Sequence, residues 1–477
     1  MDHKKKKQQN RRISVRTIRE VGIDRLKNWI PVLTASIKRA GGSVVAVNDR
    51  VVAALSRFAS KRFTLPLFVV FSFFCLWLTA TIGGYNLIHL KKEIQFTFYQ
   101  LYLCDFSAGF CSRVIVGAII ELFMDTVSIA QMKAIANGAV IVSFVLFSFV
   151  IGQVLRRGLK ERAFAPVLFA AVLLFEPVVV QSNYLFLGTL DVYTLILFLC
   201  TLCAYGTPFF YIAAPVFSAL GLMVHYHYFF SFLPAVMALT VYDIFLGQTK
   251  RRRVAGAVGA GATGVTSGGL FLYLVFFAKN HLKCTPDEFY ERMAARFDIS
   301  VGARARLESL LNGSVVFRDY FDYYIFGYYE GDYYYGSGIS FIDFLRRDRI
   351  SRTDTALYFK YFAYTFPVFV AFIVFWLICS YRQKGSRRIP YVVFAFVTLA
   401  LFPELFISSD VLRWVSATLT CQFALLFAVY LNGDAMVRTV LGGSEKKALV
   451  QKSACVACAV VYIAVMLYVG RALPIFK

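Results

Sequence analysis

Charged residues are scarce in this chain, and acidic residues are the scarcest. Only 17% of the 477 residues are Asp, Glu, Lys or Arg, and 28 acidic residues stand against 51 basic ones. Apolar residues make up 58% of the chain, and the mean hydropathy is +0.62. An ordinary soluble domain carries about 25% charged and about 45–50% apolar residues. The composition therefore excludes a soluble globular protein and predicts a membrane protein.

Signals of several other protein classes are missing or out of context. The first long apolar run begins only near Phe63, which argues against a cleavable signal peptide. Most of the ten cysteines lie inside apolar runs, where they act as small packing residues. The glycines of Gly259–Gly264 match a dinucleotide-binding pattern, but they follow three arginines and have no βαβ context. We interpret them as small residues that let membrane helices approach closely.

Basic residues gather outside the apolar runs. The first 62 residues hold 16 Lys and Arg against four acids and abut the first apolar run. We interpret this block as a basic amphipathic tail at the cytoplasmic membrane surface, and not as a nucleic-acid-binding arm. Further basic clusters occupy every second gap: Arg156–Arg162, Lys250–Arg253, Arg382–Arg388 and Lys446–Lys447. Because cytoplasmic loops retain Lys and Arg, these gaps and the N-terminus are predicted to face the cytoplasm.

The predicted fold is an all-α polytopic helical bundle in the plasma (inner) membrane. A span needs about 20 apolar residues, and we expect about 11 spans. The chain then has four regions. These are the tail (1–62), an N-terminal transmembrane module (63–278) with a first outward loop (83–133), a Tyr-rich extracytoplasmic loop domain (279–358), and a C-terminal transmembrane module (359–477).

The first outward loop carries two residues that could do chemistry. Its apolar run Val114–Phe123 is too short to cross the bilayer, so we expect an interfacial or re-entrant helix there. Just before it, Asp105 could act as a general base or hold a divalent cation. Arg113 begins the helix and could clamp a phosphate through its guanidinium. The alternative is an Asp–Arg pair that only pins the loop.

Three further candidates fall at the outward ends of predicted spans. Asp191 is an acid at membrane depth, which is costly and typical of functional sites. His225 and His227 could bind a metal only in an extended segment or a turn, because on a helix they splay apart. Phosphate or hydroxyl binding and simple interfacial packing remain open for this pair. Pro177 is expected to break its helix and leave Glu176 among the lipid headgroups.

Asp410 and Arg413 complete the candidate set. They stand three residues apart and share a face if the segment is helical. Together they could bind a sugar phosphate, with Arg413 as the anion clamp. The alternative is a surface pair that satisfies only itself. On the predicted topology, all seven candidates lie on the side opposite the basic clusters.

The plan of the chain resembles the glycosyltransferase-C superfamily. The resemblance is carried by Asp105 in the first outward loop beside a short helix and by the large later outward region. The sequence around Asp105–Arg113 and the segment Asp410-Val-Leu-Arg-Trp also look like bacterial multi-spanning proteins of surface-polysaccharide loci. The resemblance implies transfer of a sugar from a polyprenyl-phosphate donor to a glycan or lipid-linked acceptor, in bacterial surface-polysaccharide synthesis. It also implies that Asp105 is the catalytic base or a metal ligand. No paired acid accompanies Asp105, so we expect no certain cofactor and leave a divalent cation open.

The sequence thus predicts an extracytoplasmic membrane glycosyltransferase. Asp105 is the expected catalytic residue, and the expected substrate-binding residues are Arg113, Asp191, His225, His227, Asp410 and Arg413. Two alternatives remain: a polymerase of polysaccharide repeat units, and a lipid or solute transporter. Against a transporter, the sequence has no inverted repeat.

Overall fold

The computed structural model describes residues 53–82, 101–182, 188–278, 283–284, 288, 292–293, 295–297, 352–401, 411–442 and 459–468. Within these ranges the regular secondary structure is helical, beside one isolated bridge between Val127 and Phe297. The predicted all-α class is therefore confirmed for this part of the chain. The chain divides into two compact units, Met1–Lys61 with Leu159–Arg162, and Arg62–Gly158 with Ala163–Lys477.

The first unit contains the end of the predicted basic tail. Residues 53–59 are helical, and the Ser56 hydroxyl donates a hydrogen bond to the Lys160 carbonyl over 3.1 Å. The rest of the tail lies outside the described residues, as does most of the predicted Tyr-rich domain. The division into four regions stays a prediction.

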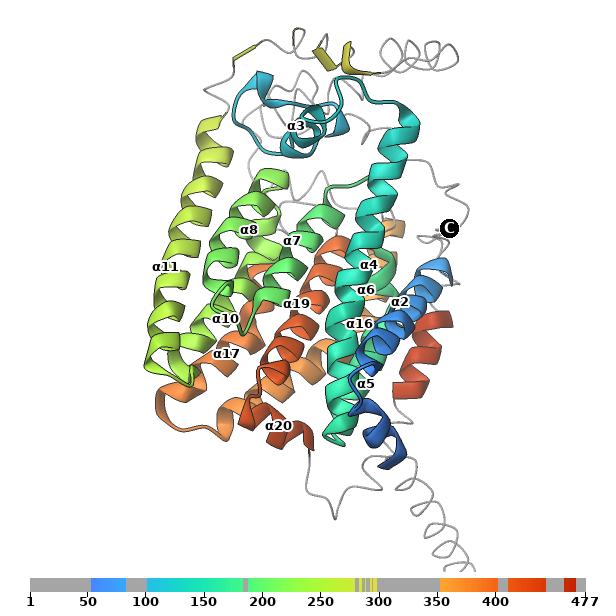
Figure 1. Ribbon diagram of the computed structural model, residues 1–477, viewed down its shortest axis with the longest axis vertical. Coiled ribbons are helices and arrows are strands. Elements are labelled where there is room, and N and C mark those ends of the chain that lie inside the picture. Colours follow the sequence, from blue (N-terminus) through green and yellow to red (C-terminus); the bar gives the residue numbers. More distant parts are fainter. Residues whose placement is uncertain are drawn as a thin grey trace, which may run out of the picture. The chain divides into compact units, whose positions relative to one another are not determined.

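The second unit holds a succession of apolar helices (Figure 1). From the N-terminal side these are α2 (Thr64–Ile82), α3 (Ile115–Glu121), α4 (Ile129–Lys160), α5 (Phe164–Leu174), α6 (Pro177–Ser182), α7 (Asp191–Ala204), α8 (Phe210–Val224), α9 (Tyr228–Ser231), α10 (Leu233–Leu246), α11 (Lys250–Leu272), α16 (Arg352–Tyr381), α17 (Ile389–Phe396), α19 (Val411–Leu431) and α20 (Ala435–Gly442). Short helical turns are η2 (Phe106–Ala108), η3 (Tyr273–Phe277), η6 (Gly385–Arg388) and η7 (Val397–Leu401).

Five helical segments of the described chain are long and apolar enough to cross a membrane. They are Thr64–Thr81, Ile129–Lys160, Tyr228–Leu246, Lys250–Phe277 and Arg413–Leu431. Five shorter apolar helices accompany them: Phe164–Leu174, Asp191–Ala204, Phe210–Val224, Thr365–Tyr381 and Ala459–Tyr468. These helices suggest a lipid environment. The count of about 11 spans remains a prediction, because several predicted spans are shorter or broken.

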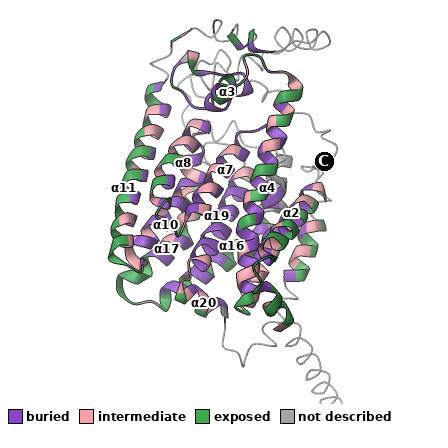
Figure 2. Ribbon diagram, viewed as in Figure 1, coloured by how far each residue is buried: buried purple, intermediate pink, exposed green. Residues whose placement is uncertain are grey.

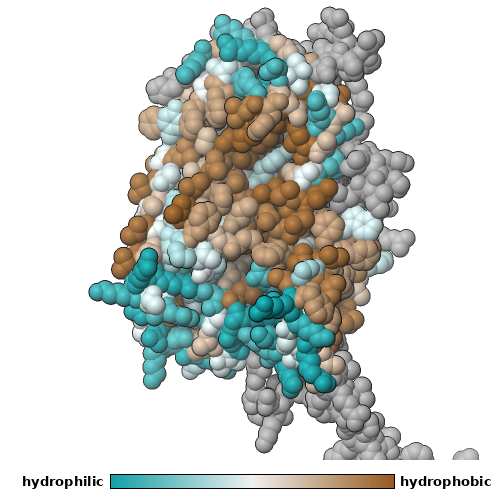
Figure 3. All heavy atoms as spheres, viewed as in Figure 1, coloured by the Kyte–Doolittle hydropathy of each residue, from teal (hydrophilic) through white to brown (hydrophobic). Residues whose placement is uncertain are grey.

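Helix α11 lies at the edge of the second unit and turns apolar side chains outward. Only 17% of the residues in its 18-residue apolar stretch are buried. Exposed residues run along this helix in Figure 2, and Val254, Val258 and Val265 are exposed. On the face seen in Figure 3, apolar residues occupy the middle and hydrophilic residues gather toward the two ends. The predicted close packing of its glycines holds for Gly259, where a Cβ would lie 3.0 Å from the Tyr211 ring of α8, but not for Gly261, where a Cβ would meet nothing within 4 Å.

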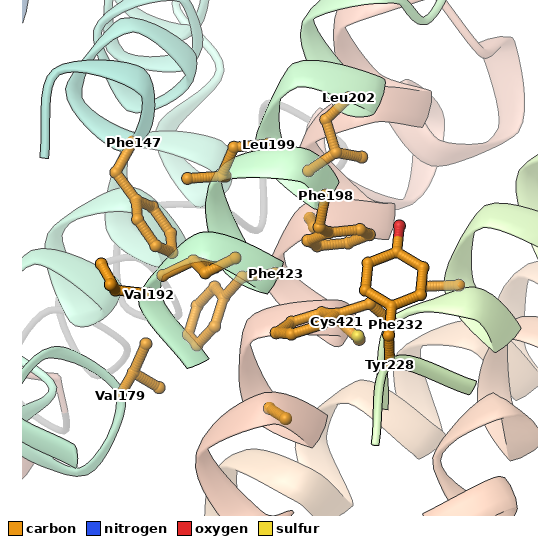
Figure 4. Packing of buried hydrophobic residues seen from close by; sticks show 14 of the residues in the cluster. Phe147, Val179, Val192, Phe198, Leu199, Leu202, Tyr228, Phe232, Cys421 and Phe423 are labelled. Carbon is orange, nitrogen blue, oxygen red and sulfur yellow. The ribbon is translucent and has the colours of Figure 1, made fainter. Parts of the chain in front are cut away.

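Helix α19 is the centre of the packing, because 94% of the residues in its 18-residue apolar stretch are buried. Figure 4 shows Phe423 and Cys421 of α19 among side chains from α4, α6 and α7. The rings of Phe198 and Phe232 stack beside them with centroids 4.8 Å apart. Because lipid tails are as apolar as these side chains, close packing and interhelical hydrogen bonds hold such helices together. One such bond joins Trp376 of α16 to Gln422 over 2.8 Å.

The predicted break before Pro177 is present, between α5 and α6, but the position expected for Glu176 was wrong. Its side chain is fully buried rather than placed at an exposed helix end. Tyr462 donates a hydrogen bond to Glu176 Oε2 over 2.6 Å. The Leu174 carbonyl at the break accepts a hydrogen bond from the Thr79 hydroxyl of α2 over 2.8 Å. Proline removes a backbone donor and interrupts the helix, so neighbouring helices satisfy the groups that it frees.

The two ends of the second unit differ in chemistry. At one end, which we name the basic end, Arg157 donates to the Leu431 carbonyl and Arg252 donates to Asn432 Oδ1 over 3.0 Å. We name the other end the α8 C-terminal end. There α7 begins at Asp191, α19 begins at Val411, and α8 ends at Val224.

Candidate functional site

Asp105 is built into a tight turn of the first predicted outward loop. It caps the short helix η2, and its carboxylate Oδ1 accepts a hydrogen bond from the Ser107 amide over 2.7 Å. An extended residue followed by this side-chain bond is the usual way for Asp to start a helical turn. The residue is only 8% exposed. One carboxylate oxygen is therefore engaged in shaping the loop.

Arg113 joins this loop to the end of α8. Its backbone amide donates to the Met223 carbonyl over 2.9 Å. Its φ of 74° lies in the left-handed region, which costs a non-glycine residue about 1–3 kcal/mol and often marks a functional constraint. The guanidinium donates to the Tyr226 hydroxyl over 3.2 Å and lies 5.2 Å from the centre of the Tyr226 ring. Arg113 thus contacts Tyr226, the residue between the two histidines.

His225 and His227 form a compact turn after α8. The His227 amide donates to His225 Nδ1 over 3.0 Å, so the proton of a neutral His225 ring sits on Nε2. Burial lowers the pKa of His225 well below its usual value, and the positive charges of Arg113, His227 and Arg413 lower it further. His225 is therefore a neutral hydrogen-bond donor at neutral pH, set among arginines.

The geometry of this pair is poor for chelating a metal. The two ring centroids are 5.6 Å apart at an interplanar angle of 76°, and His225 Nδ1 is already engaged by a backbone amide. Within the described ranges, no group of three or more His, Cys, Asp or Glu side chains could hold a metal ion.

Asp191 and Arg413 form a bidentate ion pair. Arg413 Nε and Nη2 donate to the two carboxylate oxygens of Asp191, each over 2.6 Å. Their side chains are 13% and 23% exposed. The sequence had paired Arg413 with Asp410, which lies outside the described residues. Arg413 instead binds an acid 222 residues earlier, and the pair fastens the start of α19 to the start of α7.

Trp414 adds a residue that the sequence argument did not single out. It is only 6% exposed, and its ring packs edge-on against His227 with centroids 4.1 Å apart. Its indole Nε1 is buried with no hydrogen-bond partner in the described part of the chain. A buried donor without an acceptor is costly, which makes this N–H a candidate contact for a ligand. In the sequence, its position directly after Arg413 was the feature that could have identified it as a candidate.

Arg296, like Trp414, was not identified from the sequence. It belongs to the later outward region and binds the first loop through hydrogen bonds. Its Nη1 donates to the Leu103 carbonyl over 2.6 Å, and its Nη2 donates to the Gly117 carbonyl over 3.2 Å. The Arg296 carbonyl accepts a hydrogen bond from the Val127 amide over 2.8 Å. The residue is 7% exposed. This guanidinium holds the chain on either side of Asp105, and no sequence motif marks it.

The structure therefore gathers most of the predicted residues at the α8 C-terminal end. The charges of Arg113, His227 and Arg413 all act on His225, and Asp191 joins this group through its ion pair with Arg413. Asp105 stands eight residues before Arg113 in the same loop. Two arginines, a neutral imidazole donor and a buried indole N–H together favour an anionic or oxygen-rich ligand. Compared with protein-family models, curated proteins and solved structures, the chain matches none of them.

Proposed function

We propose that this chain is a membrane glycosyltransferase. It moves a sugar from a polyprenyl-phosphate-linked donor to an acceptor on the extracytoplasmic face of the membrane. The observation that supports it best is the position of His225, a neutral donor whose charged neighbours include Arg113 and Arg413. By the positive-inside rule we take the basic end as cytoplasmic, which assigns this cluster to the outer face.

In the proposed reaction, the acceptor hydroxyl attacks the anomeric carbon of the donor sugar. The bond between that carbon and the phosphate oxygen breaks, and polyprenyl phosphate leaves with the electron pair. Asp105 takes the proton of the acceptor hydroxyl on the carboxylate oxygen that does not bind Ser107. Arg113 and Arg413 stabilise the negative charge that grows on the phosphate, and the Nε2 proton of His225 adds a hydrogen bond.

The ion pair with Asp191 has a clear role in this scheme. A bidentate carboxylate fixes the plane of the Arg413 guanidinium before substrate arrives. A fixed guanidinium needs little reorganisation when charge develops on the leaving group, and this preorganisation is where electrostatic catalysis gains most. Asp191 is thus proposed as a positioning residue rather than a catalytic one.

The test is the set of lipid-linked saccharides in cells that lack the chain. We expect a polyprenyl-linked glycan that is one sugar short, restored by the natural sequence but not by Asp105→Asn or Arg113→Gln. Arg251→Gln, an exposed arginine at the basic end, is the matched control and should restore the product. Accumulation of complete single repeat units would instead identify a polymerase. Unchanged glycans would reject the proposal and favour a transporter.

A further inference from the structure

A cavity lies toward the basic end of the second unit, apart from the cluster described above. It has a volume of about 280 Å³ and is partly open. Its walls come from the C-terminal halves of α4, α7 and α19 and from the turn between α7 and α8. The proposed transfer reaction uses none of the residues that line it, so the cavity needs an explanation of its own.

The lining of this cavity is electrically neutral. Among the described residues, none of the side chains that line it is charged. Two guanidinium groups lie near its wall, and both are already bound: Arg252 pairs with Asp243 over 2.8 Å, and Arg157 donates to the Leu431 carbonyl. Helices α7 and α19 also reach the cavity with their C-terminal ends, where the last carbonyls carry partial negative charge. An anion gains little in such a place, and an uncharged ligand is favoured.

Three polar side chains of the lining keep hydrogen-bonding capacity for a ligand. Gln153 is partly buried, and its amide has no hydrogen-bond partner among the described residues. Asn432 accepts from Arg252 through Oδ1 over 3.0 Å, which leaves its Nδ2 group to donate. The Thr207 hydroxyl donates to the Ala204 carbonyl over 2.7 Å, and its oxygen can still accept. Uncharged donors and acceptors side by side suit a hydroxyl group, which needs both.

Apolar side chains line the part of the cavity that lies farther from the basic end. On α19, Ala428 and Ala424 stand one and two helical turns before Asn432, so the lining extends about 12 Å along this helix. On α4, Val150 stands about one turn before Gln153. The alanine side chains are small and leave room beside α19. The cavity is therefore polar toward the basic end and apolar away from it, which is the polarity of a lipid headgroup followed by its chain.

We propose that this cavity binds an uncharged lipid with a hydroxylated headgroup, such as a diacylglycerol. The headgroup hydroxyl bonds to Gln153 and Asn432, and the beginning of an acyl chain lies along Ala424 and Ala428. The volume falls just below the range of about 300–1,000 Å³ that is usual for small-molecule sites, so it suits a headgroup and the first part of a chain. A free polyol offers the same hydroxyl groups but nothing that matches the apolar walls, which favours the lipid.

Photo-crosslinking tests this proposal on the full-length protein in phosphatidylcholine nanodiscs. The probe is a trace of diacylglycerol that carries a diazirine near the start of one acyl chain, and crosslinked peptides are mapped by mass spectrometry. We expect crosslinks at 150–153 and 424–432, and we expect them to fall at least threefold when excess dioleoylglycerol is added. Crosslinks to the exposed residues Val254, Val258 and Val265 of α11 serve as an internal control. They should change little, because contact with the bulk bilayer is not saturated.

Competitors and variants separate this site from general contact with lipid. Dioleoyl phosphatidic acid, which has the same chains and a charged headgroup, and free glycerol should leave the cavity crosslinks unchanged. Gln153→Leu removes the amide and Ala428→Leu fills the cavity, so each should lower the displaceable crosslinking. Val145→Leu, at an exposed position of α4 outside the lining, should not.

Two results would overturn the proposal. One is a set of cavity crosslinks that dioleoylglycerol does not displace, and the other is equal displacement by phosphatidic acid or by glycerol. This outcome is independent of the glycan test, because no residue of the proposed transfer site takes part.

Discussion

Replacement of Gly117 by alanine should disturb the first outward loop more than its small size suggests. Gly117 lies in the middle of α3, and a Cβ there would meet the Cys104 carbonyl oxygen at 2.1 Å and the Cys104 amide nitrogen at 2.8 Å. Both contacts are with backbone, which cannot rotate away as a side chain can. The two segments would have to separate by roughly 1 Å, and overpacking of this kind costs about 1–3 kcal/mol.

Alanine also has a higher helix propensity than glycine, by about 1 kcal/mol, so the two effects oppose each other. Because the clash is backbone against backbone, we place its cost at the upper end of the range. The net loss of stability is then about 2 kcal/mol, or roughly a 30-fold change in the equilibrium constant. Gly138→Ala in α4 is the matched control, because a Cβ there meets nothing within 4 Å. It should leave stability unchanged or raise it slightly.

Two measurements check this reasoning on the purified protein in detergent. Thermal unfolding followed by tryptophan fluorescence should show a lower midpoint for Gly117→Ala and none of this loss for Gly138→Ala. Alkylation of Cys104, which is fully buried, should become faster only in Gly117→Ala because the loop must lift away from α3. If the two variants unfold at the same temperature and leave Cys104 equally protected, the packing of α3 against residue 104 is not as described.

Five further substitutions test the candidate site. Asp191→Asn and Arg413→Gln should each cost about 1.5–3 kcal/mol of stability, and the double variant should cost less than their sum in a double-mutant cycle. Trp414→Phe should leave the unfolding temperature nearly unchanged but lower the glycan transfer proposed above, since it removes only the buried N–H. Arg296→Met should make the first loop more susceptible to proteolysis. A loop that stays resistant would mean that the hydrogen bonds of Arg296 contribute little to its stability. Burial lowers the pKa of His225, so its unfolded form binds the proton more readily: stability should be full above about pH 6.5 and fall below it, and His225→Gln should remove part of that slope in unfolding measured against pH.

The all-α class could be predicted because it depends on local apolar periodicity and on the position of charge. The short helix before residue 122 and the break at Pro177 both followed from chain length and proline chemistry. The partners of the charged residues could not be predicted in the same way. Arg413 has an acid three residues before it in the sequence, yet it binds Asp191, because only the packed helices decide which charges meet.

Arg296 shows the same limit more clearly. A single arginine in a long polar region has no periodicity and no motif, and its three carbonyl partners are backbone groups that any sequence provides. Trp414 stands beside Arg413 in the sequence, but a role for it could be inferred only once its burial and its contact with His227 were known. Sequence patterns located the candidate residues, whereas their roles depended on distances.

The buried carboxyl at the α5–α6 break has a consequence for the order of assembly. Glu176 receives its hydrogen bond from Tyr462, which is synthesised 286 residues later. During insertion, the early helices hold an acid in the membrane well before its hydroxyl partner exists, so they cannot reach their final arrangement alone. The last described helix thus acts as a closing element for the first ones. A truncation before residue 459 should therefore weaken the packing around α2, α5 and α6 first, although those helices lie at the other end of the chain.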